Sequence, residues 1–244
     1  MKGRSSPILV IIPARGGSKG IPKKNLSPLH GKSLTEWAII SARQINFDKF
    51  IVLSSDLPEI LDLSSNYYDV IPSSRPEELC QDYIADYQVL RHELIKAESE
   101  RSEQFECVVM LQPTSPIRNP LTLNACVDAV INRGKSSAWA VVDVPKRYHP
   151  RKQLDIAGEK LRLVIDSPTV IARQQLTLTY IRTGVCYAFT RSTVLSDEKL
   201  LGANGLPVVC DWTSVNIDDP EDLVQAHELT KVSNGILIPK GGIS

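Results

Sequence analysis

The chain has 244 residues, of which 42% are hydrophobic and 23% charged, as in an ordinary globular protein with a substantial core. Basic and acidic residues both number 28, so the net charge is zero and the basic excess typical of nucleic-acid-binding proteins is missing. No apolar run is long enough to cross a membrane, and no secretory signal peptide is visible. The five cysteines are widely spaced and include no C-x-x-C pair, which argues for a reducing compartment and against structural zinc. We therefore expect one cytoplasmic domain over residues 1–244, with no nucleic-acid or membrane partner.

The segment Ile8–Asn25, ILVIIPARGGSKGIPKKN, joins an apolar strand to a cationic loop. The β-branched residues from Ile8 to Ile12 predict a strand that is buried on both faces. The following loop has glycines that permit a sharp turn and a close approach to a ligand, and basic residues with no acid among them. This combination at the end of a buried parallel strand is typical of a polyphosphate site. The alternative is a solvated basic surface loop.

Several common motifs are absent from the sequence. Neither G-x-x-x-x-G-K-[ST] nor G-x-G-x-x-G occurs, which argues against a P-loop NTPase and a dinucleotide-dependent dehydrogenase. G-x-S-x-G and H-E-x-x-H are also missing, and the histidines are scattered along the chain. The cationic loop therefore belongs to another kind of nucleotide or phosphate site.

Predicted strands and helices alternate through the first part of the chain. Residues 33–45 show apolar residues at helical spacing, and Ser33 with Glu36 forms a capping box at the start. Short strands are predicted over 49–54 and 70–71, with a helix between them. This order predicts an α/β fold with a mostly parallel central sheet flanked by helices.

A long amphipathic helix is predicted over 82–100, and a buried strand over 105–111. The residues expected to face inward on the helix are Tyr83, Tyr87, Leu90, Leu94 and Ile95. The strand leads into QPTSPIRNP, a proline-stiffened loop that carries Gln112 and Arg118. Open α/β sheets bind ligands at this end of their strands, although a rigid turn is the simpler interpretation of this loop alone.

The second half of the chain begins with a helix predicted over 121–132 and a strand over 137–142. Residues 143–172 are polar and rich in turn signals, with short alternating runs, so we expect a β-rich excursion from the main sheet. Strand character returns over 180–189.

Residues 208–215 are predicted to lead to the last sheet strand, which closes at NIDDPEDL. Asp219 is expected to cap a helix that runs to about Val232, followed by a loosely held tail from Asn234. Asn216 and Asp218 are two apart on the predicted strand and so share a face. A carboxylate and an amide can together hold one Mg²⁺, which prefers oxygen ligands. A helix cap is the alternative role for Asp218, but Asp219 already fills it.

The motifs PARGGSKGIPKKN, RPEEL followed by Asp82, LQPTSPIR, ARQQ, Thr183-Gly184-x-x-Tyr187 and NIDDPEDL resemble those of the acylneuraminate cytidylyltransferases (CMP-sialic acid synthetases), in the same order. The resemblance covers nearly the whole chain. It implies a Rossmann-like nucleotidyltransferase fold that uses Mg²⁺ and converts CTP and a nonulosonic (sialic-type) acid into a CMP-sugar and pyrophosphate. It also implies a homodimer, formed through an excursion such as residues 143–172 that reaches toward the partner's active site.

The same resemblance assigns roles to residues. It implies that phosphate charge is neutralised in catalysis by Arg15, Lys19 and Lys24. The residues that would bind the nucleotide are Ala14, Gly16, Gly17, Ser18, Asn25, Arg75 and Asp82. Those that would meet the sugar acid are Gln112, Thr114, Ser115, Arg173, Gln174, Thr183 and Tyr187. The metal would be held by Asp218 and, at the position of a second aspartate in the family, Asn216.

Two positions depart from the family pattern. Asn216 replaces an aspartate, which leaves the number of protein-bound metal ions open. Thr183 replaces an asparagine before the motif glycine, which leaves the sugar open among a sialic acid, a legionaminate- or pseudaminate-type acid and an octulosonate. A nucleotidyltransferase with another substrate and a nucleotide-binding homologue with weakened catalysis remain the alternatives. No side chain stands out as a general base.

Overall fold

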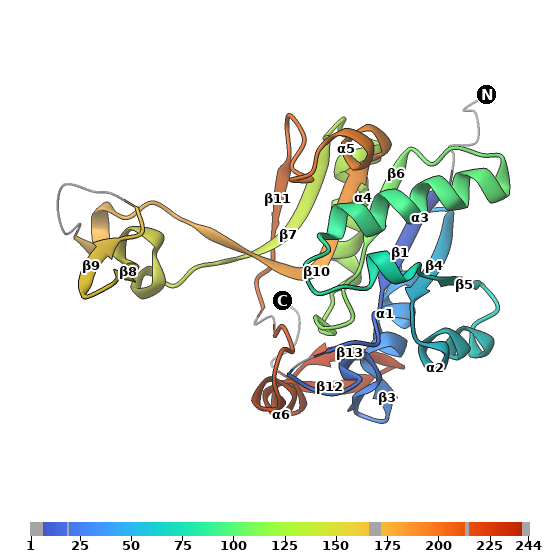
Figure 1. Cartoon of the computed structure of the whole chain (residues 1–244), viewed down its shortest axis with the longest axis horizontal. Coiled ribbons are helices and arrows are strands. Elements are labelled where there is room, and N and C mark those ends of the chain that lie inside the picture. Colours follow the sequence, from blue (N-terminus) through green and yellow to red (C-terminus); the bar gives the residue numbers. More distant parts are fainter. Residues whose placement is uncertain (1–6, 19, 166–171, 213–214, 241–244) are drawn as a thin grey trace.

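The computed structural model describes residues 7–18, 20–165, 172–212 and 215–240. The main sheet contains β1 (Ile8–Pro13), β4 (Lys49–Ser55), β5 (Val70–Ser74), β6 (Cys107–Met110), β7 (Ser137–Asp143), β10 (Tyr180–Thr190) and β11 (Leu206–Val209). These seven strands lie in the order β11-β7-β10-β6-β1-β4-β5 (Figure 1). Only β10 runs antiparallel to its neighbours β6 and β7, and the remaining pairs are parallel. The predicted α/β fold with a mostly parallel sheet is confirmed.

Helices cover both faces of this sheet. They are α1 (Leu34–Arg43), α2 (Pro58–Leu61), α3 (Asp86–Arg101), α4 (Pro120–Ile131) and α5 (Arg191–Ser196), with α6 (Pro220–Leu229) near the end of the chain. The short 3₁₀ turns are η1 (Lys24–Leu26), η2 (Asp62–Asn66), η3 (Glu77–Leu79), η4 (Lys146–Tyr148), η5 (Pro150–Lys152) and η6 (Arg173–Gln175), and a small hairpin pairs β2 (Pro28–Leu29) with β3 (Lys32–Ser33). None of the described helices is both long and apolar enough to span a membrane.

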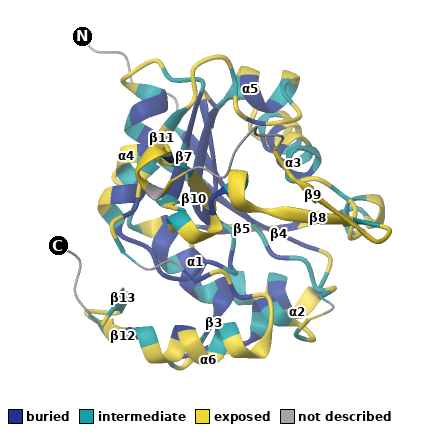
Figure 2. Ribbon diagram, turned by 90° about the vertical axis from the view of Figure 1, so that its left-hand side faces the viewer, coloured by how far each residue is buried: buried dark blue, intermediate teal, exposed yellow. Residues whose placement is uncertain are grey.

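Strand β1 is buried because alternate side chains enter different cores. Val10 and Ile12 pack in a cluster with α1 and α4, while Leu9 and Ile11 pack in a second cluster with α3 and α5. Every residue from Ile8 to Ile12 is at most 1% exposed. Figure 2 shows central strands of the main sheet coloured as buried. The loop after β1 therefore follows a strand that is packed on both faces.

The capping box predicted for the first helix is present, since Ser33 and Glu36 bond reciprocally at the start of α1. The start predicted for the next long helix is wrong. Helix α3 begins at Asp86, and the preceding residue is in an extended conformation. Tyr83 and Ile95, which were expected to face inward, are 82% and 50% exposed. Residues 82–85 belong instead to the segment that leads over the cavity described below.

The predicted β-rich excursion is present between β7 and β10, and we call residues 144–179 the arm. Its tip is a hairpin of β8 (Leu154–Ala157) and β9 (Lys160–Leu163), which projects far from the sheet (Figure 1). At its base the Val144 amide donates to the Thr179 carbonyl at 2.9 Å. The apolar side chains exposed on the hairpin are Leu154, Ile156, Leu161, Leu163, Val164 and Ile165. Residues 166–171 of the predicted excursion lie outside the described part of the chain.

The end of the chain differs from the sequence prediction. Strand β11 stops at Val209, and Asn216 and Asp218 lie in irregular chain. Helix α6 has Asp219 as its N-cap, as predicted, but ends at Leu229. The next residues form a hairpin of β12 (Thr230–Ser233) and β13 (Ile236–Pro239), where a loose tail was expected. The hairpin is held because Leu237 is buried in a third apolar cluster with residues of the β2–β3 hairpin and α1.

Candidate active site

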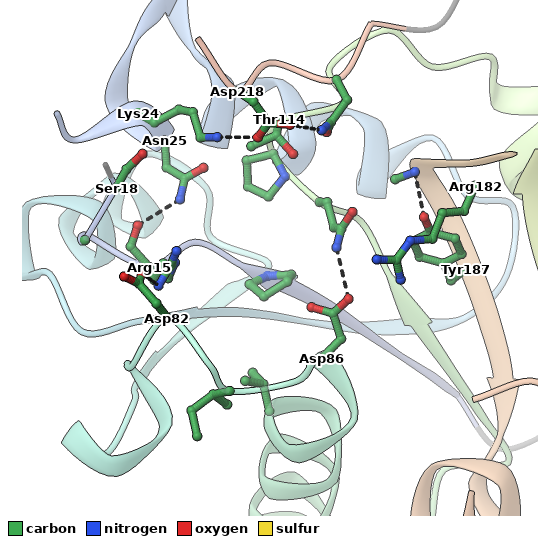
Figure 3. Close-up of a pocket in the computed structure, with 18 of the residues that line it drawn as sticks. Arg15, Ser18, Lys24, Asn25, Asp82, Asp86, Thr114, Arg182, Tyr187 and Asp218 are labelled. Carbon is green, nitrogen blue, oxygen red and sulfur yellow. Dashed lines mark hydrogen bonds and ion pairs between the residues drawn. The ribbon is translucent and has the colours of Figure 1, made fainter. Parts of the chain in front are cut away.

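A cavity with a volume of about 570 Å³ opens at the carboxyl ends of β1 and β6 (Figure 3). The segments that line it come from the cationic loop, the chain before α3, the loop after β6, strand β10 and the chain before α6. All of the motifs behind the family resemblance except ARQQ contribute described residues to its wall. The cavity thus collects, from segments far apart in the sequence, most of the residues that the sequence nominated.

Two cations of the loop are paired with carboxylates across the cavity. The Arg15 guanidinium lies 2.6 Å from Asp82 Oδ1, and Lys24 Nζ lies 2.7 Å from Asp218 Oδ1. Both aspartates are more than one-third exposed, so each pair contributes little to stability. An incoming polyphosphate can therefore replace these carboxylates at small cost. Lys23, by contrast, pairs with Glu59.

The loop backbone is fixed by other contacts. Gly16 N–H donates to Asp56 Oδ1 at 2.7 Å, and the Asn25 side chain donates to the Arg15 carbonyl at 2.8 Å. A Cβ on Gly20 would lie 2.2 Å from the Asp218 carbonyl oxygen, so this position requires glycine. Gly17 and Ser18 line the cavity with Arg15, whereas the predicted Ala14 and Gly16 do not. Lys19 lies outside the described residues.

Among the described residues that line the cavity, Arg75 is the most deeply buried cation, with 7% of its surface exposed. Its Nε donates to Ser54 Oγ at 3.2 Å, and the same hydroxyl donates to Glu93 Oε1 at 2.6 Å. Burial lowers the pKa of Arg75, and the charge of nearby Glu93 partly opposes this shift. Glu93 is only 1% exposed, although it stands on the apolar face of α3. The buried Glu93 carboxylate thus helps to hold Arg75 in place through the hydroxyl of Ser54.

The opposite wall of the cavity is built on β10 and the loop after β6. Gly184 has φ +74°, and a Cβ there would lie 2.4 Å from Ser115 Oγ and 2.7 Å from Gln112 Oε1. The Gly184 amide donates to the Tyr187 hydroxyl at 2.7 Å, which orients that ring. Burial raises the pKa of Tyr187 to about 12. Gln112, Thr114 and Tyr187 all line the cavity, and their contact with a sugar acid stays a prediction.

Not every predicted sugar-side residue presents its polar group there. Thr183 lines the cavity, but its hydroxyl donates to the Ala140 carbonyl at 2.9 Å. Ser115 is fully buried and braces the wall, with its hydroxyl bonded to the Thr183 carbonyl at 2.6 Å. Gln174 is exposed on the arm and does not line the cavity. Arg173 has its backbone in η6, and its side chain lies outside the described part of the structure.

Sequence reasoning missed Asp86 and Arg182, which both line the cavity. Asp86 Oδ2 accepts from Gln112 Nε2 at 3.2 Å. Burial raises the pKa of Asp86, while the charges of Arg182 and Arg75 act in the opposite direction. Figure 3 shows Arg182 beside Tyr187, across the cavity from the cationic loop. Proximity to a recognised motif was the only available signal: Asp86 follows Asp82 closely, and Arg182 directly precedes Thr183.

Arg118 was noted in the sequence but given no role. It is 2% exposed, and its guanidinium donates to the Val185 carbonyl at 2.9 Å and to the Gln112 carbonyl at 2.6 Å. Burial lowers its pKa to about 10. Arg118 therefore fixes the loop after β6 against β10, so that the two halves of this wall form one unit.

The expected metal ligands also lie together. Asn216 Nδ2 donates to Asp218 Oδ2 at 2.6 Å, and Asn216 Oδ1 accepts from Ser115 at 3.2 Å. Both residues are exposed and line the cavity. Among the described residues, no group of three or more histidine, cysteine, aspartate or glutamate side chains is placed to hold a metal ion. One carboxylate and one amide oxygen fit Mg²⁺ that brings phosphate oxygens and water as further ligands.

Comparison with known proteins gives a consistent result. The family model described as Cytidylyltransferase matches residues 9–192. The CMP-N,N'-diacetyllegionaminic acid synthase of Legionella pneumophila is 29% identical over 95% of this chain and 99% of its own length. The pseudaminic acid cytidylyltransferase of Campylobacter jejuni is 28% identical over 93% of this chain and 97% of its own length.

The fold is also found among solved structures. A structure of CMP:2-keto-3-deoxy-manno-octonic acid synthetase complexed with CTP superposes with a TM-score of 0.67, covering 92% of this chain and 98% of that one at 15% identity. At that identity the likeness shows the fold alone. The family match covers β1 through the start of α5, which includes the cationic loop, the chain before α3 and the wall built on β10. The chain belongs to the cytidylyltransferase family.

Proposed function

We propose that this protein transfers CMP from CTP to a nonulosonic acid, giving a CMP-sugar and pyrophosphate. The observation that carries the proposal is a single cavity with a cationic loop on one side, an oriented tyrosine and amide on the other, and a carboxylate–amide pair between them. Family membership supports CTP as the nucleotide. The names of the relatives from Legionella and Campylobacter support a legionaminic- or pseudaminic-type acid as the acceptor.

The reaction uses the two sides of the cavity differently. The anomeric hydroxyl oxygen attacks the α-phosphorus, the bond from that phosphorus to the bridging oxygen breaks, and the hydroxyl proton is released. Phosphoryl-type transfer depends mainly on positioning and on neutralising charge. Arg15 and Lys24 would leave their carboxylate partners to neutralise the phosphates, and Lys19 stays a prediction for the same role. Arg75 and Asp82 would surround the nucleoside.

On the other side, Gln112 and Tyr187 would orient the sugar acid. Tyr187 is suited to this role because the Gly184 amide donates to its hydroxyl and orients it, while a phenol O–H can itself donate a hydrogen bond. The Thr183 hydroxyl already donates to a backbone carbonyl, so Thr183 would shape the cavity wall more than it would bind the sugar acid through its hydroxyl. Arg173 and Gln174 would act from the arm, and in a dimer they could serve the partner's cavity.

Asp218 and Asn216 would hold Mg²⁺ at this site. The ion supplies positive charge to phosphate oxygens and helps to orient the triphosphate. Because Lys24 and the Asn216 amide occupy the Asp218 oxygens, we expect weak metal binding without nucleotide. Calorimetric titration of Mg²⁺ should show tight binding only when CTP is present. Tight binding to the free protein would place the metal elsewhere.

We further propose a homodimer of one-domain subunits, formed through the arm. The hairpin of β8 and β9 exposes its apolar side chains and forms no core of its own. Burying them against a second copy is the simplest way to remove them from water. The base of the arm joins the sheet beside the cavity, so a docked arm would also fix the nearby sugar-side wall.

The test is an assay of pyrophosphate release with CTP, Mg²⁺ and a panel of sugar acids: legionaminic, pseudaminic, sialic and octulosonic. We expect release only when a nonulosonic acid is present, and CTP should be preferred over UTP, ATP and GTP. Binding of CTP without turnover on any acid would instead favour a regulatory nucleotide-binding protein. Equal use of purine nucleotides would contradict the cytidylyltransferase assignment of the cavity.

A further inference from the structure

Two histidines meet where the last segments of the chain pack on its first half, and we call them the histidine pair. His30 lies in the turn between β2 and β3, and His227 lies in the last turn of α6. Their ring centroids are 4.8 Å apart. Figures 1 and 2 both show α6, the C-terminal hairpin and β3 together at one end of the molecule, below the main sheet. The proposed mechanism gives the histidine pair no role.

Hydrogen bonds fix the direction of both rings. The buried Thr230 hydroxyl donates its hydrogen to the Ala226 carbonyl, so it can only accept from His30 Nε2, which lies 3.0 Å away. His227 Nε2 donates to the Pro28 carbonyl at 3.4 Å, since a carbonyl only accepts. Each histidine therefore joins two segments: His30 joins the β2–β3 turn to β12, and His227 joins α6 to β2.

The surroundings of His30 oppose its protonation. Burial, the charge of His227 and the charge of Lys240, which directly follows β13, lower the pKa of His30, while hydrogen bonding to the backbone of Thr230 and His227 acts in the opposite direction. Among the described residues, neither histidine is in an ion pair. A histidine whose pKa is lower in the folded than in the unfolded protein adds stability above the unfolded value, and this contribution is lost as the pH falls through the folded-state pKa. Acidification therefore brings like charges together at this contact.

The histidine pair joins the two segments that supply a cation and a carboxylate to the active-site cavity. Lys24 lies in η1, shortly before β2, and Asp218 directly precedes the N-cap of α6. Lys24 Nζ lies 2.7 Å from Asp218 Oδ1. Leu29 and Ala226, which neighbour the two histidines in sequence, are buried in the same apolar cluster. A shift of α6 against the β2–β3 hairpin would therefore change the separation of Lys24 and Asp218.

We propose that His30 and His227 are positioning residues that set Asp218 against Lys24, and that protonation of the pair loosens this contact and weakens binding of the triphosphate with its metal. When uncharged, the two rings pack together and their Nε2 donors hold the segments in place. When both are charged, they repel each other across the same contact. This inference rests on the proposed function, because it concerns groups assigned there to the triphosphate and Mg²⁺. Neither histidine lines the cavity itself.

The first test measures the coupling of the two rings in the protein without ligand. An NMR titration of the imidazole C–H signals should give a pKa for His30 below 6.5 in the wild type. In His227→Gln this pKa should rise by at least about half a unit, because a nearby positive charge disfavours the protonated form. His92→Gln makes the same change on α3 and should leave the pKa of His30 as in the wild type. A pKa of His30 that does not respond to His227→Gln overturns the proposal.

The second test measures CTP affinity by calorimetry in the presence of Mg²⁺, at about pH 7.5 and about pH 5.5, on either side of the ordinary histidine pKa. The phosphates of CTP also gain a proton over this range, so each protein is described by the ratio of its two dissociation constants. The loss of affinity on acidification should be at least about threefold larger for the wild type than for His227→Gln, the factor that corresponds to half a pKa unit. His92→Gln should lose affinity as the wild type does. A merely structural histidine would change affinity equally at both pH values.

The outcomes separate this proposal from the proposed function. Equal losses of affinity in wild type and a folded His227→Gln variant, checked by thermal unfolding, overturn the positioning role while leaving CMP transfer intact. A smaller loss in His227→Gln, together with the rise in the pKa of His30, supports it. Failure of the wild-type protein to bind CTP at either pH refutes the proposed function, and the positioning role falls with it, whereas the NMR titration still decides whether the two histidines are coupled.

Discussion

Glu93 should control CTP affinity without touching CTP. The substitution Glu93→Gln keeps the shape of the side chain and an oxygen that can accept the Ser54 hydrogen bond, now 2.6 Å long. It removes the negative charge that supports Arg75 in a site where only 7% of that arginine is exposed. A hydrogen bond to a charged group contributes about 1.5–3 kcal/mol, and one between neutral groups about 0.5–1.5 kcal/mol. The change should therefore cost about 1–1.5 kcal/mol.

We expect the weaker hydrogen bond to let the Arg75 side chain move more freely. Ser54 accepts from Arg75 Nε, so a Ser54 hydroxyl that is held less firmly also holds Arg75 less firmly. CTP affinity should fall by about tenfold, which corresponds to ~1.4 kcal/mol. The KM for CTP should rise more than kcat falls. Calorimetric titration of CTP in the presence of Mg²⁺ gives the affinity, and urea unfolding gives the stability of each variant.

A matched control lies on the same helix. Glu98 pairs with Arg191 at 2.8 Å and does not line the cavity. Glu98→Gln should lower the free energy of unfolding but leave CTP affinity unchanged. If Glu93→Gln behaves in the same way, with reduced stability and wild-type CTP affinity, Glu93 is a structural carboxylate only and the reasoning about Arg75 is wrong.

Three further predictions follow from the site and the arm. Lys24→Ala should reduce turnover by about two orders of magnitude, the effect of losing one positioned charge in the transition state, and a near-wild-type rate in a pyrophosphate assay would remove Lys24 from the mechanism. Deleting residues 155–165 should convert a dimer into a monomer in light scattering, and a wild-type monomer at micromolar concentration would contradict the arm's role. Because burial raises the pKa of Asp86 above 3.8, its ionised form destabilises the free protein, and the favourable contribution present at low pH is lost as the pH rises through the folded-state pKa. Asp86→Asn should therefore raise the melting temperature more at neutral pH than at a pH below the ordinary aspartate pKa. Equal increases at the two pH values would contradict this prediction.

Local signals in the sequence predicted much of the fold. The β-branched run of β1, the capping box of α1 and the N-cap Asp219 all depend on residues a few positions apart, and all are present. The start of α3 was missed because Asp82 and Ile84 line a cavity whose other walls come from distant parts of the chain. The C-terminal hairpin was missed for a similar reason, since the burial of Leu237 depends on a cluster formed by other segments.

The candidate site likewise combines features that a local sequence pattern predicts with features that depend on distant segments. Motif residues such as Arg15, Gln112 and Asp218 each occur in a distinctive local pattern, and the structure brings them together in one cavity. The direction of individual polar groups could not be predicted. Whether the Thr183 hydroxyl enters the cavity or bonds to Ala140 depends on the register of β10 against β7, which no local pattern specifies. Asp86 and Arg182 are recognisable only once α3 and β10 are placed side by side.

The base of the arm has a consequence for how such proteins can change over time. Val144 and Thr179 meet through one backbone hydrogen bond, so the chain leaves the sheet and returns to it at nearly the same point. A gene could lengthen, shorten or exchange the intervening segment without altering the strand register on either side. The proposed subunit contact on the arm and the proposed nucleotide side of the cavity can therefore diverge independently. The wall on β10 lies next to the point where the chain returns to the sheet, so a change there would affect the proposed subunit contact and the proposed acceptor site together.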